Sequence, residues 1–156
     1  MDFADFDLRS ASEAGRWVHL EHSGRPLYVQ PDKTVSAEPS DKPCRIHLRG
    51  IMAPGVRELI KQIARNTAAL QARINRAKDS EIEKLIEAAE AKGEEALRDL
   101  ICNAVAGWEN IIIGGKAAEP DRDTLLRVCG PGTAFFGQVY EAILEQHDFL
   151  SGAARG

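Results

Sequence analysis

The feature that most constrains the fold is a change of hydrophobic period near residue 55. Residues 44–49 alternate strictly, with Cys44, Ile46 and Leu48 on one face and basic residues on the other, as in a half-buried strand. From Gly55 onward, apolar residues recur every three or four positions, which predicts a helix with a narrow, heptad-like seam. A chain with both patterns must pack a sheet against helices. The sequence therefore predicts an α+β fold.

Further β-rich segments precede residues 44–49. Residues 16–20 and 26–30 favour strands and are separated by a turn around Ser23-Gly24, which is typical of a hairpin. Residues 31–43 contain three prolines and are expected to form a loop. We therefore expect a small N-terminal antiparallel sheet of about three strands, with one face that helices must cover.

The helical part has several expected boundaries. Neither Gly nor Pro interrupts residues 56–92, which favours one continuous helix, but Ser80-x-x-Glu83 resembles a capping box that would begin a second one. Both alternatives fit the pattern. Gly93 is expected to break this region, and a further helix is expected over residues 94–106. A short helix over 122–129 and a last helix capped by Thr133, with His147 and Leu150 on its apolar stripe, complete the prediction.

The 156 residues suit one domain, or one small module with a helical partner. We expect a flexible acidic arm at 1–15, a small β module at 16–53, a mainly helical region at 55–150 and a flexible tail at 151–156. The three cysteines are odd in number and widely spaced, which favours a reduced cytoplasmic protein. The acidic start is unlike a secretory signal, and no apolar run approaches the ~20 residues of a membrane span.

Charge is distributed in two consecutive blocks. Residues 45–78 hold eight Lys or Arg against one acid, and residues 79–99 hold eight acids against three bases. Two antiparallel helices with facing charges would explain the blocks, and a basic face for an acidic partner is an alternative. Binding of nucleic acid is not expected, because residues 55–78 contain no aromatic side chain for stacking and no helix-turn-helix signature.

Two sets of residues have side-chain types that suit metal binding or catalysis. His19-x-x-His22 with Cys44-x-x-His47 has ligand types that suit zinc, but an i, i+3 pair in a strand points to opposite faces. For nucleophilic catalysis, Cys102 or Cys129 would have to pair with His147, and no orienting acid is evident. The sequence therefore predicts no metal, no cofactor and no enzymatic activity.

Trp108 is the more informative of the two tryptophans, since Gly107 is a helix-stop signal. We therefore expect Trp108 at the end of a helix, where it would anchor either the core or a partner surface.

The order of these parts resembles the tail assembly chaperones of long-tailed bacteriophages, the siphophages in particular. The matching motifs, over residues 8–150, are Gly24-Arg25-Pro26-Leu27, Leu48-Arg49-Gly50 before a long basic helix, Gly107-Trp108-Glu109, the short helix from Asp121 to Val128, and Phe149-Leu150. The chain departs from the family at Ile51-Met52-Ala53-Pro54 and in the apolar run Ile111-Ile112-Ile113.

The resemblance implies a non-enzymatic protein of the host cytoplasm that is absent from the mature virion. Such a chaperone binds the helical tape measure protein and helps to recruit the major tail tube protein; a homo-oligomer is compatible with this role. The expected contact residues form a seam, a basic stripe and one aromatic anchor: Ile63, Leu70 and Ile74; Arg57, Lys61 and Arg65; and Trp108. The alternatives are a tail completion or connector protein and a small nucleic-acid-binding regulator.

Overall fold

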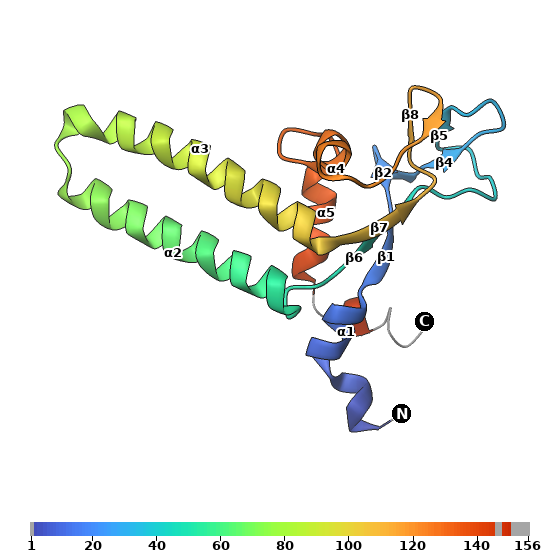
Figure 1. The fold of residues 1–156 in the computed structure, drawn as a ribbon, viewed down its shortest axis with the longest axis horizontal. Helices are drawn as coiled ribbons and strands as arrows, with labels where there is room; N and C mark the ends of the chain where they lie inside the picture. The colour runs from blue at the N-terminus through green and yellow to red at the C-terminus, as the bar shows by residue number, and fades with distance from the viewer. Residues whose placement is uncertain (1, 146–147, 151–156) are drawn as a thin grey trace.

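A three-stranded antiparallel sheet and a long helical hairpin dominate the structure (Figure 1). This computed structural model describes residues 2–145 and 148–150. The hairpin extends away from a body in which the sheet and the shorter helices lie together (Figure 1). The predicted α+β class is confirmed.

The central sheet has the order β1-β6-β7 and is antiparallel throughout. Its strands are β1 (Arg16–His19), β6 (Arg45–Leu48) and β7 (Val105–Glu109). The alternating pattern at 44–49 thus becomes the middle strand, with Ile46 and Leu48 completely buried. The third strand, β7, comes from the region expected to be helical, so the sheet is not built from residues 16–53 alone.

Three two-stranded hairpins flank this sheet. The turn at Ser23-Gly24 is present, but it joins two very short strands, and β1 itself pairs with β6. Part of the expected loop 31–43 also pairs, through residues 35 and 36. The strands are β2 (Glu21–His22) with β3 (Arg25–Pro26), β4 (Tyr28–Val29) with β5 (Val35–Ser36), and β8 (Ile112–Ile113) with β9 (Lys116–Ala117).

The long hairpin consists of two helices, α2 (Pro54–Arg76) and α3 (Asp79–Ala104). They are separated at Ala77 and Lys78, whose backbones are extended, so the region forms two helices and not one. The capping box expected at Ser80 and Glu83 is wrong, because α3 begins at Asp79 with Lys78 as N-cap and has no side-chain hydrogen bond at its cap. The expected break at Gly93 is wrong, and residues 94–104 are the last part of α3. A single glycine costs a helix only about 1 kcal/mol, and its neighbours here are strong helix formers.

The expected helix end at Gly107-Trp108 is also wrong. Helix α3 ends at Ala104, and the chain continues directly into β7, where Trp108 lies opposite Ile46. Pairing with β6 therefore gives a strand conformation to a segment whose local sequence pattern resembles the last turn of a helix.

The ends of the chain contain more helix than expected. The segment predicted to be a flexible arm forms a 3-10 turn, η1 (Phe3–Phe6), and helix α1 (Leu8–Ala14), in which Ala11 and Ser12 are buried. Helix α4 (Arg122–Cys129) matches its prediction, with Asp121 as N-cap. Helix α5 (Phe136–Leu144) has Phe135, not Thr133, as N-cap. His147 and residues 151–156 lie outside the described residues.

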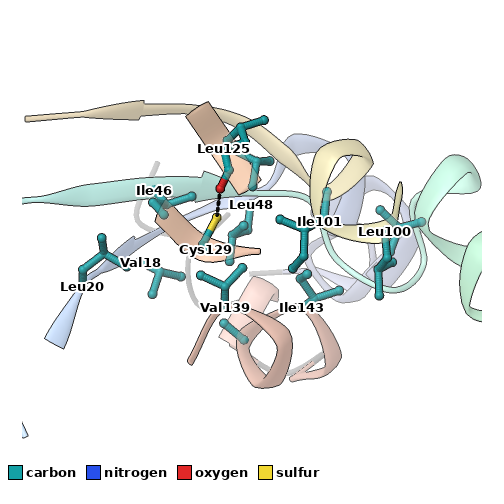
Figure 2. Packing of buried hydrophobic residues seen from close by; sticks show 14 of the residues in the cluster. Val18, Leu20, Ile46, Leu48, Leu100, Ile101, Leu125, Cys129, Val139 and Ile143 are labelled. Carbon is teal, nitrogen blue, oxygen red and sulfur yellow. Dashed lines mark hydrogen bonds between the residues drawn. The ribbon is translucent and has the colours of Figure 1, made fainter. Parts of the chain in front are cut away.

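The core forms where the inner face of the sheet meets the base of α3 and helices α4 and α5 (Figure 2). Ile46 and Leu48 of β6 pack in one cluster with Leu100 and Ile101 of α3, and all four are 0% exposed. The other helices contribute further side chains to the cluster, among them Leu125, Cys129, Val139 and Ile143. None of the helices described combines the length and the apolar character that a membrane span needs.

Replacing Ile101 tests this core. The change Ile101→Ala removes buried side-chain atoms at the base of α3 and should lower the free energy of unfolding by about 2–5 kcal/mol. Ile86→Ala is the matched control, because Ile86 is 39% exposed on the outer part of the same helix, and it should cost less than about 1 kcal/mol. Urea unfolding measures both; equal losses would contradict this description of the core.

Candidate functional site

The most unusual surface of the molecule is the α2–α3 hairpin, whose outer part has no completed core. From Arg57 to Asp99, no residue is buried; the buried residues of the two helices are Val56 at one end and Leu100, Ile101 and Ala104 at the other. Two helices cover each other along one stripe only, whereas a stable helical domain adds a further layer. That further layer is missing here.

The predicted seam lies where α2 meets α3. Ile63, Leu70 and Ile74 are all half-buried. Two of them, Ile63 and Leu70, also line a groove of about 210 Å³ along the hairpin. The other side of this groove is formed by α3, which contributes Leu85, together with small residues such as Ala89 and Ala96. An apolar, partly open groove between the two helices is therefore the strongest candidate site.

The predicted basic stripe lies elsewhere on α2. Arg57 and Lys61 border a hollow at the base of the hairpin, together with Arg9 and Glu13 of α1. Arg65 is exposed and forms an ion pair with Glu58, at 3.0 Å. None of these three cations lines the groove. The structure thus does not bring the stripe and the seam to one surface.

The two charge blocks become the two antiparallel helices, but they do not neutralise each other. Within the described residues, no ion pair joins α2 to α3; the ion pairs of the hairpin are Arg65–Glu58 and Arg98–Glu94, each within one helix, and Arg122–Asp99, from α4 to α3. Apolar and small residues therefore hold the helices together, and most of the charges remain available to solvent or to another molecule.

Trp108 has a structural role that is visible in its contacts. It is half-buried and packs against the core, and its indole N–H donates a hydrogen bond to the carbonyl oxygen of Ala118 at 2.7 Å. This bond fastens the chain after β9 to the sheet. Contact with a partner stays a prediction for this residue.

The change Trp108→Phe tests the structural role. It keeps an aromatic ring but removes the N–H donor, so the Ala118 carbonyl loses its partner, and stability should fall by about 1–2 kcal/mol. Thermal or urea unfolding gives the value. An unchanged midpoint would show that the hydrogen bond contributes nothing.

Sequence analysis did not single out Trp17, although this is the more exposed tryptophan, at 44%. It stacks on His47, with ring centroids 4.9 Å apart, and the Arg45 guanidinium lies 5.2 Å from its ring centroid. Arg45 is in turn ion-paired with Glu109. The signal was present in the alternation of β1, which places Trp17 on the face opposite buried Val18.

The proposed zinc-type residues are not brought together. The His19 ring nitrogen lies 2.7 Å from the Leu27 carbonyl oxygen, His47 contacts the Ala14 carbonyl oxygen at 3.0 Å, and Cys44 is buried in the core. Over residues 2–145 and 148–150, no group of three or more His, Cys, Asp or Glu side chains has the arrangement of a metal site.

The cysteine environments disfavour a thiolate. Burial raises the pKa of Cys129 to about 12 and that of Cys44 to about 11. The Cys129 Sγ also donates a hydrogen bond to the Leu125 carbonyl oxygen, at 3.3 Å. Desolvation raises the pKa of half-buried Cys102 as well. Because a nucleophilic cysteine must be deprotonated, these surroundings suit packing better than catalysis.

Thiol reactivity tests this difference. In the Cys102→Ala variant at pH 8, Cys44 and Cys129 should react with an aromatic disulfide reagent at least about 100-fold more slowly than in urea, because an unfolded thiol has a pKa of about 8.5. Absorbance of the released thiolate follows the reaction. Rapid modification of the native variant would contradict the burial of both side chains.

A second apolar cleft, of about 400 Å³, is lined by residues of the body and by none of the α2–α3 hairpin. Its lining includes the apolar run Ile111–Ile113, with Leu27 and Phe135. The run that departs from the phage family pattern thus contributes to the core through Ile111 and to this cleft through all three residues.

Comparison of the chain with protein-family models, with curated proteins and with solved structures finds no match in any of the three.

Proposed function

We propose that this protein is an assembly chaperone of a phage tail, which binds the helical tape measure protein through the α2–α3 hairpin. The observation that carries the proposal is the absence of any buried residue from Arg57 to Asp99 in a hairpin that extends from the body. Such a hairpin lacks one layer of packing, and a helix from another chain can supply it.

The physical properties of the two molecules complement each other. A tape measure protein is a long helix with apolar stripes, which would aggregate if left bare. The hairpin offers apolar side chains along its seam, including Ile63, Leu70 and Leu85, all half-exposed. Contact between the two would bury part of the apolar stripe of the tape measure and part of the apolar surface of the hairpin. The body of the chaperone would stay outside this contact.

Partial exposure of the seam also suits a temporary complex. The residues of the seam are already half-buried in the hairpin, so each gains only part of its full burial energy on binding. The major tail tube protein, polymerising around the tape measure, would then displace the chaperone in the host cytoplasm. Catalysis has no part in this role.

The charge of the hairpin favours a protein partner over nucleic acid. Helix α2 carries five cations and one acid, but the adjacent α3 carries eight acids and three cations. A nucleic-acid backbone carries a charge on every phosphate, so along its length it would also meet the acids of α3, whereas a protein helix can place a few carboxylates opposite single cations.

Co-expression with a phage tape measure protein tests the proposal. The wild-type chain should keep the tape measure soluble, and the double change Ile63→Ser with Leu70→Ser should lower the soluble yield by roughly tenfold, since removal of two apolar contacts costs at least about 1.4 kcal/mol. Far-ultraviolet circular dichroism must show that the variant keeps its helix content.

The double change Phe3→Ser with Phe6→Ser is the matched control, because these side chains are 93% and 55% exposed on η1, far from the seam. It should leave the yield of soluble tape measure unchanged. An insoluble tape measure beside abundant wild-type chain would refute the proposal. Retention of the chain in purified virions at a fixed copy number would instead identify a structural tail component.

A further inference from the structure

We infer that the groove between α2 and α3 selects an acidic amphipathic helix, with an apolar stripe flanked by carboxylates on both sides. The inference rests on the proposed function in one respect only, namely that a helix docks on the hairpin. It adds the chemical character of that helix, which follows from the charges in the groove.

The groove carries two cations and no anion. Arg73 lies on its α2 side and Lys92 on its α3 side, and among the described residues that line it there is neither Asp nor Glu. Both cations are exposed, and neither forms an ion pair with a described residue. This is unexpected for Lys92, since α3 as a whole holds eight acids.

Apart from the two cations, and from Asn66 and Thr67 on the α2 side, the lining of the groove is apolar. It includes Leu70, Leu85, Ala88, Ala89 and Gly93, so small side chains dominate on the α3 side. Small residues allow two helix backbones to approach closely, which increases the contact along an apolar stripe. The groove thus fits a helix whose inward face is apolar and whose flanks face the two cations.

The positions of the cations also set a spacing. Lys78 lies in the turn at the tip of the hairpin. Arg73 is five residues from it along α2 and Lys92 is fourteen residues from it along α3, so Lys92 lies nine residues farther from the tip. At 1.5 Å per residue this is about 13 Å along the hairpin. A matching helix would therefore carry one carboxylate on each flank, about 13 Å apart along its axis.

A second copy of this chain is a poorer occupant. A two-fold symmetric contact through the groove would bring two Arg73 and two Lys92 side chains into one interface, with no carboxylate from the lining to neutralise them. Like charges at an interface oppose association, so the same charges that favour an acidic helix disfavour self-docking.

Two synthetic peptides provide the test. Each has about 20 residues, enough for a helix, and both share the same Leu and Ala stripe; one has Glu at the flanking positions and the other has Lys. Fluorescence anisotropy measures their binding to the full-length chain. The Glu peptide should bind about tenfold more tightly, a difference of about 1.4 kcal/mol. The net charge of −4 on the protein would by itself favour the Lys peptide.

The double change Arg73→Glu with Lys92→Glu should reverse this preference. Both side chains are exposed, so the fold should tolerate the changes, and circular dichroism checks that it does. The control is Lys42→Glu with Lys116→Glu, which alters the net charge by the same amount at exposed positions in the body. It should leave the preference for the Glu peptide intact.

Equal binding of the two peptides, or a preference that survives charge reversal in the groove, would overturn the inference. A dimer seen by sedimentation and broken by the groove variant would also overturn it, because the occupant would then be a second copy. These outcomes do not depend on the tape measure. If the wild-type chain does not distinguish the two peptides but keeps the tape measure soluble, only the inference about the groove is refuted. If it prefers the Glu peptide but leaves the tape measure insoluble, only the chaperone role is refuted.

Discussion

The whole structure depends on the contact between the middle strand β6 and the base of helix α3. Ile46 and Leu48 lie at the centre of the core with Leu100 and Ile101, and all four side chains are completely buried. The chain leaves the sheet after β6, passes along α2 and α3, and returns as β7 beside the strand it left. The hairpin is therefore an insertion between two neighbouring strands, and the same core that holds the sheet fixes its direction.

Local patterns predicted the elements that local interactions determine. The alternation at residues 44–49 identified β6, the heptad-like spacing identified α2, and Asp121 with its following residues identified α4. β7 was missed because its strand character arises from pairing with β6, which lies more than fifty residues earlier, and not from its own sequence. The expected break at Gly93 was wrong because one glycine costs a helix only about 1 kcal/mol, which the helix formers around it outweigh.

The candidate site was predictable to a similar extent. Of the seam residues, Ile63 and Leu70 line the groove between the two helices, and Ile74 is half-buried. Periodicity alone did not show that the seam would remain half-exposed, since that depends on the absence of a third layer. Nor did it show that Arg73 and Lys92, from blocks of opposite overall charge, border the same groove. That arrangement follows from the antiparallel return of α3.

The link between the end of β6 and the end of α3 has a consequence for how the chain reaches this fold. The Arg49 amide donates to the Ala104 carbonyl oxygen at 2.7 Å, and its guanidinium donates to the Asn103 carbonyl oxygen at 2.9 Å. Joining β6 to β7 without the hairpin would require closing a long flexible loop, which is entropically slow. If α2 and α3 pair first, starting from the tight turn at residues 77 and 78, they bring the ends of the two strands together. The strands β6 and β7, which are far apart in the sequence, would then pair when they already lie close together in space.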